Sequence, residues 1–224
     1  MAKIQTFQSY YIGSEIELTQ QHKSQLVSCF EKPMQPAKAV LGGRAAVTTI
    51  QLKDIGPAVV KNYTRGGVIR YFNRHTYLKF SRYRCQSEYE LLLFLDRIGV
   101  SVPEPIAFAC QGKFSYHAWL VTREIQNVST LAEFSRQHPD KTRTVMQDLA
   151  QQLGILIENH IHHVDLHPGN VLVDDHNNLF IIDFDKAQTT PQNRHKLQKE
   201  YIRRWQRAVL KYKLPAVLNN IVDL

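Results

Sequence analysis

The feature that most constrains this chain is residues 163–185, HVDLHPGNVLVDDHNNLFIIDFD. Two short apolar runs in this stretch flank a polar turn at 174–178, a pattern that predicts a β-hairpin. Since a hairpin brings its two ends together, we expect Asp183, after the second strand, to lie beside Asn170, before the first. Asp165 precedes Asn170 by five residues. The sequence therefore predicts two carboxylates and one amide around a single turn.

This set of side chains suits phosphoryl transfer from a nucleotide. In that chemistry an Asp on the catalytic loop accepts the proton of the attacking hydroxyl, and an Asn five residues later holds a magnesium ion. Asp183 supplies a second hard oxygen ligand, as Mg²⁺ prefers. We therefore predict Asp165 as the catalytic residue and Asn170 with Asp183 as Mg²⁺ ligands. The alternative is that these acids belong to ordinary polar turns.

A lysine and a glutamate upstream complete the predicted set. Residues 58–61, AVVK, match the V-A-I-K pattern, in which a buried strand ends in a lysine that binds nucleotide phosphates. In the helical pattern at 87–98, Glu88 lies on the side of the leucines, whereas Glu90 lies roughly 200° away from it at about 100° per residue. We predict that Lys61 binds the nucleotide and that Glu88 pairs with it. Glu90 is the alternative partner.

A glycine pair ahead of the lysine strand is a further candidate for nucleotide binding. Residues 41–44 read LGGR, and missing side chains at Gly42 and Gly43 would let backbone N–H groups approach the phosphates. The segment lacks the full G-x-G-x-x-G spacing of a phosphate-covering loop.

The order of these motifs resembles the protein-kinase-like superfamily over about residues 41–185. Four segments resemble, within that superfamily, the lipopolysaccharide core kinases, most closely those that act on 3-deoxy-D-manno-octulosonic acid (Kdo). They are LGGR at 41–44, the lysine strand running into Arg65-Gly66-Gly67, the SEYELLLFL helix, and IDFDKA ending at Ala187.

This resemblance implies an α+β, two-lobed protein-kinase-like fold in a single domain. A small antiparallel-sheet N-lobe with one crossing helix would span about residues 1–122, and a reduced, mainly helical C-lobe about 128–224. The hinge between them, 123–127, would meet the adenine ring through the backbone of Glu124 and Ile125.

For function, the resemblance implies ATP-dependent and Mg²⁺-dependent phosphorylation of a hydroxyl of Kdo in Kdo-lipid A during lipopolysaccharide core biosynthesis. Asp165 would orient and deprotonate that hydroxyl, and Lys61, held by Glu88, would bind the phosphates of ATP. The partner would be a lipid-linked phosphorylated sugar acceptor. The protein would then act as a peripheral protein at the cytoplasmic face of the bacterial inner membrane.

Departures from the protein-kinase pattern leave the acceptor open. Residues 163–165 lack the arginine of H-R-D, Asp185 replaces the glycine of D-F-G, and no A-P-E follows. These differences argue against a protein kinase that is switched by phosphorylation of its activation loop. The motif DLHPGN at 165–170 and the run at 99–103 also resemble segments of aminoglycoside and other small-molecule phosphotransferases. A soluble small-molecule kinase is therefore the alternative.

A third alternative is a kinase fold without catalysis that serves as a basic binding module. Such a module would not require the complete set of Lys61, Asp165, Asn170 and Asp183.

The net charge of +8 is concentrated in two blocks. Residues 61–87 contain seven Lys or Arg and no acid, interleaved with aromatic residues such as Tyr63 and Tyr83. Basic residues with aromatics bind nucleic acid or an anionic membrane surface. Because this block joins the lysine strand to the Glu88 helix, we expect it to hold the phosphorylated, membrane-bound acceptor. We expect no nucleic acid partner.

The second basic block, residues 194–213, contains eight Lys or Arg and one acid. Its spacing predicts a helix with one apolar stripe and one basic stripe. This helix either packs on the core with a solvated outer face or also binds an acidic membrane leaflet. A membrane-bound acceptor predicts that neutralising Arg203, Arg204 and Arg207 lowers activity, whereas a soluble acceptor predicts no loss.

Composition is consistent with a compact enzyme. The chain has 224 residues, 43% of them hydrophobic, and three widely spaced cysteines that suggest no disulfide framework. We expect no signal peptide and no membrane span from the apolar runs present. Four histidines at 160–167 could suggest a transition-metal site, but the motif already assigns His163 to support of the catalytic loop. The oligomeric state is not predicted.

Local signals predict the remaining elements. Paired strands are expected at 105–110 and 116–122, a capping box at Thr130 and Glu133 begins one helix, and a second helix covers about 141–158. Residues 1–36 are expected to contain one strand and a helix near 19–30.

Overall fold

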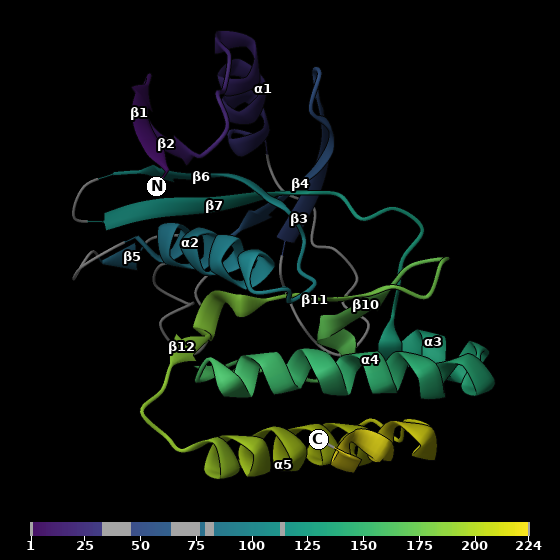
Figure 1. The fold of residues 1–224 in the computed structure, drawn as a ribbon. Helices are drawn as coiled ribbons and strands as arrows, with labels where there is room; N and C mark the ends of the chain where they lie inside the picture. The colour runs from purple at the N-terminus through teal and green to yellow at the C-terminus, as the bar shows by residue number, and fades with distance from the viewer. Residues whose placement is uncertain (1, 33–45, 64–76, 79–82, 113–114, 224) are drawn as a thin grey trace. The chain divides into compact units, whose positions relative to one another are not determined.

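The computed structural model describes residues 2–32, 46–63, 77–78, 83–112 and 115–223 (Figure 1). They form two compact units, one of Met1–Leu93 with Glu104–Glu124 and one of Phe94–Pro103 with Ile125–Leu224. The first unit is built on an antiparallel sheet, and the second is mainly helical. The chain therefore has a mixed α/β structure.

The sheet of the first unit runs in the order β1-β2-β6-β7-β4-β3, and a short β5 also pairs with β7. All of these pairs are antiparallel. The predicted lysine strand and the paired strands expected at 105–110 and 116–122 are present, and the N-terminal segment has two strands where one was expected. The strands are β1 (Lys3–Phe7), β2 (Tyr10–Ser14), β3 (Ala46–Leu52), β4 (Gly56–Asn62), β5 (Tyr77–Leu78), β6 (Pro105–Gln111) and β7 (Ser115–Arg123).

Two helices, α1 (Gln20–Phe30) and α2 (Arg84–Arg97), cover opposite faces of this sheet (Figure 1). The side chain of Thr19 accepts the N–H of His22 and caps α1, which confirms the helix expected near 19–30. On the α1 side, Phe30 stacks on Trp119 of β7 with ring centroids 4.7 Å apart. Because side chains alternate along a strand, the residues next to the buried Val60 point toward the α2 side.

The three cysteines of the chain, Cys29, Cys85 and Cys110, are free thiols buried in the first unit. Burial raises the pKa of Cys29, and it raises the pKa of Cys85 well above the ordinary value. The Sγ of Cys85 donates to the carbonyl of Ala109 at 3.4 Å. All three therefore behave as small core residues, and burial keeps Cys29 and Cys85 in the neutral thiol form.

The second unit contains three helices with local capping signals. The predicted capping box is present, since the hydroxyl of Thr130 accepts the N–H of Glu133 and the Glu133 carboxylate accepts the N–H of Thr130. The second helix begins at Pro139 rather than near residue 141, because proline suits the first helical turn. The helices are α3 (Leu131–Gln137), α4 (Pro139–Glu158) and α5 (Arg194–Lys211).

Short strands and 3₁₀ turns connect these helices. The predicted hairpin at 171–182 is present as β10 and β11, with Val171 opposite Ile181 and Val173 opposite Leu179. The strands are β8 (Ser129–Thr130), β9 (Ile161–His162), β10 (Val171–Val173), β11 (Leu179–Ile181) and β12 (Gln188–Thr189), and the 3₁₀ turns are η2 (Pro168–Asn170), η3 (Phe184–Lys186) and η4 (Ala216–Asp223).

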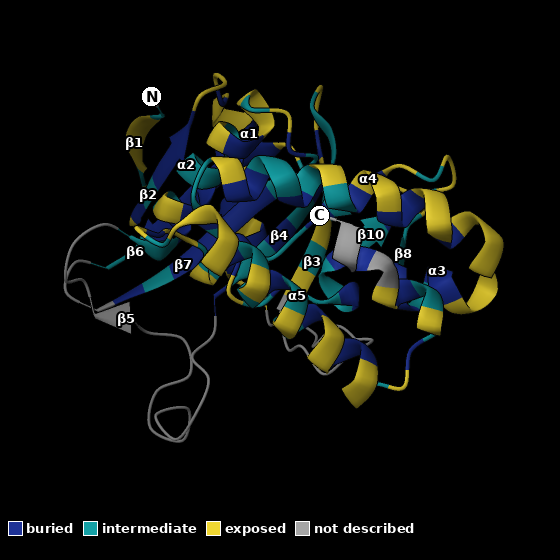
Figure 2. Cartoon of the chain, turned by 60° about the horizontal axis from the view of Figure 1, so that its bottom comes forward, coloured by how far each residue is buried: buried dark blue, intermediate teal, exposed yellow. Residues whose placement is uncertain are grey.

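The basic C-terminal helix α5 packs within its own unit, beside α4 and η4 (Figure 1). Its apolar stripe is buried, and the Nε1–H of Trp205 donates to the carbonyl of Leu218 in η4 at 2.7 Å. Exposed positions recur along the other side of the helix (Figure 2). The predicted packing of this helix on the core is confirmed. Within the described ranges, the helices are too short or too polar to cross a membrane.

Candidate active site

The first group of candidate residues lies on the α2 side of the sheet in the first unit. The Nζ of Lys61, on β4, donates to the two carboxylate oxygens of Glu88 on α2 at 3.0 and 3.1 Å. The two side chains are 16% and 3% exposed. Glu90, the alternative partner, accepts instead from Gln86 at 3.0 Å. The structure thus brings together the predicted pair, and its role in nucleotide binding stays a prediction.

Tyr63 completes this pair. Its hydroxyl donates to Oε2 of Glu88, and Nζ of Lys61 lies 5.2 Å from the centre of its ring. The side chain is only 2% exposed, so the prediction that Tyr63 belongs to an acceptor-binding basic block is wrong. The period of two along a strand could have indicated this, since Tyr63 lies two residues after Lys61 and points to the same face.

The segment predicted as the hinge starts at the end of β7. The N–H of Glu124 donates to the carbonyl of Pro57 at 3.1 Å, and the N–H of Arg123 donates to the carbonyl of Glu104 at 2.8 Å. A nucleotide base could therefore use the carbonyl of Glu124 but not its N–H group. Binding of a base by Glu124 and Ile125 stays a prediction.

The hairpin of the second unit brings the two predicted metal ligands together. The N–H of Ile182, the residue before Asp183, donates to the carbonyl of Asn170 at 3.0 Å. Asp183 has φ +67°, a left-handed conformation that Asp tolerates better than most residues. The expected return of the chain from Asn170 to Asp183 is confirmed for the backbone.

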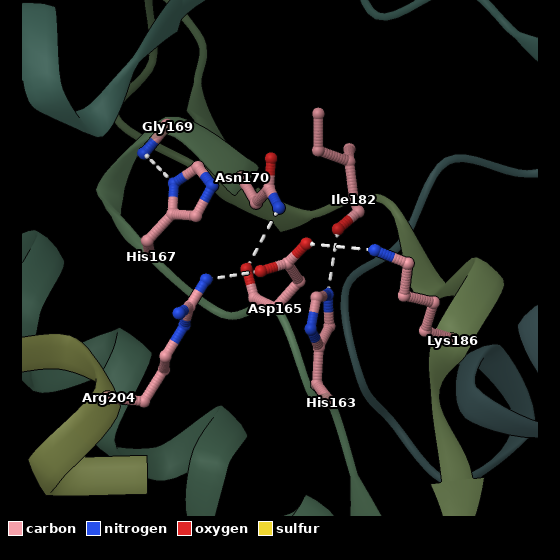
Figure 3. A network of polar contacts seen from close by, with 8 residues as sticks. All are labelled: His163, Asp165, His167, Gly169, Asn170, Ile182, Lys186 and Arg204. Carbon is pink, nitrogen blue, oxygen red and sulfur yellow. Dashed lines mark hydrogen bonds and ion pairs between the residues drawn. The ribbon is translucent and has the colours of Figure 1, made fainter. Parts of the chain in front are cut away.

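Asp165 lies beside this turn, between two cations (Figure 3). The side-chain amide of Asn170 donates to the backbone carbonyl of Asp165 at 3.0 Å. Arg204 of α5 donates through a terminal guanidinium nitrogen to Oδ1 of Asp165, and Nζ of Lys186 in η3 lies 3.5 Å from Oδ2. The Asp165 side chain is 35% exposed. Its carboxylate is therefore fixed in place while remaining accessible.

His163 stabilises the loop that carries Asp165 through hydrogen bonds. Its Nε2 hydrogen-bonds to the carbonyl of Ile182 at 2.9 Å, and its backbone N–H donates to the hydroxyl of Tyr201 at 2.9 Å. Burial lowers the pKa of His163, so the ring is neutral and donates from Nε2. The Tyr201 hydroxyl in turn donates to the carbonyl of Ile161 at 2.8 Å. The predicted supporting role of His163 agrees with these contacts.

A second histidine stabilises the turn that follows Asp165. The Nδ1 of His167 accepts the backbone N–H of Gly169 at 3.0 Å (Figure 3). Burial lowers the pKa of His167, which favours the neutral ring that this hydrogen bond requires. His163 and His167 therefore serve the structure of the loop. In the part of the chain that the structure describes, they belong to no cluster of three or more metal-binding side chains.

Sequence reasoning missed Lys186 and Arg204 as neighbours of Asp165. Arg204 lies three residues after the buried Tyr201 and four before the buried Ala208, a spacing that already placed it on the inner side of α5. Because its guanidinium contacts Asp165, neutralising Arg204 does not by itself test membrane binding. Loss of Arg204 would therefore affect the site whatever the acceptor is.

Some predicted site residues lie outside the described residues. These are Gly42 and Gly43 of the proposed phosphate-covering turn, and most of the first basic block, including Arg65-Gly66-Gly67. Their predicted roles stay predictions.

The donor set on the hairpin fits a magnesium ion. The amide nitrogen of Asn170 is used by the Asp165 carbonyl, which leaves its Oδ1 as a hard oxygen ligand. Asp183 supplies a carboxylate on the adjacent backbone. Two oxygen ligands with open positions for water and phosphate are what Mg²⁺ uses in nucleotide-dependent enzymes.

Comparison with known proteins gives a consistent result. A sequence model of the lipopolysaccharide kinase (Kdo/WaaP) family matches residues 39–220. The chain is 33% identical over 149 residues to a 3-deoxy-D-manno-octulosonic acid kinase of Vibrio parahaemolyticus serotype O3:K6, covering 65% of this chain and 62% of the relative. It is 28% identical over 172 residues to the enzyme of that name from Vibrio cholerae serotype O1, covering 74% and 72%.

A third relative, the 3-deoxy-D-manno-octulosonic acid kinase of Xylella fastidiosa (strain 9a5c), is 29% identical over 150 residues, covering 65% of this chain and 59% of the relative. The match to the Vibrio parahaemolyticus and Xylella proteins thus spans less than two thirds of their length.

Proposed function

Because the chain belongs to the lipopolysaccharide kinase (Kdo/WaaP) family, we propose that it transfers the γ-phosphoryl group of ATP to a hydroxyl of Kdo in a lipid A precursor. The relatives carry the name of that activity. The hydroxyl oxygen would form a bond to the γ-phosphorus while the bond from that phosphorus to the bridging oxygen breaks. The products are a phosphorylated sugar and ADP.

The observation that carries this proposal is the arrangement around Asp165. The side-chain amide of Asn170 donates to the backbone carbonyl of Asp165. The N–H of Ile182 donates to the backbone carbonyl of Asn170, and this hydrogen bond brings the backbone of Asp183 next to Asn170. The accessible Asp165 carboxylate would orient the acceptor hydroxyl and take its proton. Asn170 and Asp183 would hold Mg²⁺, which neutralises charge on the transferred phosphoryl group when it is bound.

Lys61 of the first unit is the proposed ligand of the ATP phosphates, with Glu88 and Tyr63 fixing the position of its ammonium group. The carbonyl of Glu124 and the backbone of Ile125 are the proposed adenine contacts. On this proposal, the sheet-containing unit and the helical unit are the two lobes of a kinase fold.

We also propose peripheral binding to an anionic membrane, because the acceptor is lipid-linked. The support is the outer side of α5, where basic residues are exposed while the apolar stripe is buried in the unit. A buried stripe cannot insert into lipid, so binding would rest on charge. The exposed basic residues are Arg194, Lys196, Lys199, Arg203, Arg207 and Lys211.

The test of the activity is incubation of the purified protein with ATP, Mg²⁺ and a Kdo-lipid A precursor, followed by mass spectrometry. We expect a mass gain of one phosphate that requires Asp165 and Asp183, and that is lost in Asp165→Asn and in Asp183→Ala. Slow ATP hydrolysis without phosphorylation of this acceptor would retain the kinase chemistry and reject Kdo. A small-molecule acceptor would then be the better assignment.

The membrane proposal is tested with vesicles of phosphatidylglycerol and phosphatidylcholine. We expect the protein to sediment with vesicles that contain phosphatidylglycerol, and charge reversal at Arg203 and Arg207 to release it. Arg204 is left unchanged in this experiment because it contacts Asp165. Equal sedimentation of the wild type and the reversed variant would reject α5 as the membrane-binding surface.

A further inference from the structure

Asp165 has more positive charge around it than the proposed phosphoryl transfer requires. The reaction needs one carboxylate to receive the proton of a neutral hydroxyl, and it places its cations on the nucleotide phosphates. Here Arg204 binds one oxygen of Asp165, and Lys186 lies 3.5 Å from the other. One cation would already balance the charge of Asp165. Two cations therefore contact the one carboxylate that would meet the acceptor.

The two cations reach Asp165 from opposite directions (Figure 3). Lys186 belongs to η3, directly after the proposed metal ligand Asp183, whereas Arg204 comes from α5. Arg204 therefore lies on a different element from the proposed metal ligands, whereas Lys186 lies close to one of them in the chain. Its side chain is 40% exposed, so a ligand can reach the guanidinium group.

The guanidinium of Arg204 also has unused hydrogen-bonding capacity. Among the described residues, its Nε is buried without a hydrogen-bond partner. Arg carries five N–H donors in a planar fork that matches a carboxylate, and a buried donor without a partner calls for a group that completes it. A second carboxylate beside Asp165 would use the guanidinium donors that are exposed there.

We infer that Arg204 binds the carboxylate of an acidic sugar and so determines the acceptor. This inference rests on the proposed function and deepens it, since Kdo is a sugar acid. On this inference, the carboxylate of the sugar contacts the fork of Arg204 while its hydroxyl contacts Asp165. Lys186 remains with Asp165 and compensates its charge. Neutral sugars lack the carboxylate that Arg204 would bind, so they would bind more weakly as acceptors.

The experiment compares two soluble acceptors, the methyl glycoside of Kdo and the methyl ester of that glycoside. The variants are Arg204→Met, Arg204→Lys and the control Arg143→Met, an exposed arginine on α4 of the same unit. We expect Arg204→Met to raise the KM for the acid by about 10- to 100-fold, the effect of losing a hydrogen bond to a charged group. The KM for ATP should change little. Loss of the contact with Asp165 should lower kcat on both acceptors, and only the acid should also show the rise in KM.

The lysine variant separates charge from geometry. Arg204→Lys keeps the charge but not the fork, so it should recover part of the affinity for the acid. Folding of each variant is checked by circular dichroism and by its thermal midpoint. An equal fall of kcat on both acceptors, with the KM for the acid unchanged, would mean that Arg204 acts only by positioning Asp165. That result overturns the inference, and so does a rise confined to the KM for ATP.

A binding measurement separates this inference from the proposed function. If the wild-type protein phosphorylates no Kdo acceptor, the proposed function fails, yet binding of the two glycosides can still be compared by saturation-transfer NMR. A preference for the acid over the ester that disappears in Arg204→Met and persists in Arg143→Met supports the carboxylate site. Equal binding of acid and ester by the wild type overturns it.

Discussion

The ion pair at Lys61 and the ion pairs at Asp165 use similar groups in opposite environments. Lys61 and Glu88 are 16% and 3% exposed, and Glu88 also accepts the hydroxyl of the buried Tyr63. Asp165, Arg204 and Lys186 are 35%, 40% and 58% exposed. The first group is largely removed from water, and the second remains in contact with it.

This difference separates a fixed anchor from an exchangeable site. A buried pair costs several kcal/mol to break, because the remaining charge is left without its partner. An exposed pair contributes only about 0–1 kcal/mol, so an incoming ligand can replace one member cheaply. The burial of Lys61 suits a group that must hold one position, and the exposure of Asp165 suits a group that must receive a substrate.

The largest expected effect is on activity at the exposed site. Asp165→Asn removes the proton acceptor while keeping the shape of the side chain, and we expect kcat to fall by about 10²- to 10⁴-fold. The thermal midpoint should change little, since the ion pairs of Asp165 are exposed. The matched control is Asp148→Asn, at an exposed position of α4. Unchanged turnover of Asp165→Asn would remove Asp165 from the proposed chemistry.

The same substitution at two lysines tests the difference in stability directly. We expect Lys61→Met to lower the free energy of unfolding by about 3 kcal/mol, because it removes the cation that pairs with the buried carboxylate of Glu88. Lys186→Met should cost less than about 1 kcal/mol. Urea unfolding measures both. Equal losses of unfolding free energy in the two variants would show that burial does not make the Lys61 pair more stabilising than the Lys186 pair.

Tyr63→Phe is expected to have an intermediate effect. The change removes one hydroxyl donor from a charged, buried acceptor, which costs about 1.5 kcal/mol. A double-mutant cycle with Glu88→Gln checks the cause. Additive losses would contradict it, because residues in direct contact should show a coupling energy.

The smallest effect at neutral pH concerns His163, which burial holds in the neutral form. Its pKa is lowered in the folded protein, so the unfolded chain binds a proton more readily. The contribution of His163 to the free energy of unfolding is therefore fully present above about pH 6.5, the ordinary pKa of histidine. It falls as the pH drops below that value. We expect His163→Gln to flatten this slope in urea unfolding measured from pH 7 to 5. The exposed His176→Gln should leave it unchanged, and an unaltered slope in His163→Gln would assign the acid sensitivity to other groups.

The sequence predicted those parts of the site in which spacing along the chain determines the geometry. Strand periodicity accounts for the hairpin and for the return of the chain from Asn170 to Ile182. Strand and helix periodicity together account for the pair of Lys61 with Glu88. The capping box at Thr130 follows from a local pattern in the same way.

Contacts between segments distant in sequence could not be predicted in this way. Arg204 reaches Asp165 across 39 residues, and no local period determines which loop an inward arginine of α5 will meet. The hydroxyl of Tyr201 under His163 is another such contact. The extra strand near the N-terminus was missed because its hairpin pairs with β6, almost a hundred residues later in the chain.

The distribution of cysteine gives this protein a natural reporter of local unfolding. The only three cysteines of the sequence, Cys29, Cys85 and Cys110, belong to the sheet-containing unit and are at most 5% exposed. A thiol-specific reagent such as a disulfide dye can react with them only when that unit opens. The labelling rate of the unmodified chain therefore measures the opening of one unit alone. Its change on adding a nucleotide would show whether the nucleotide stabilises that unit.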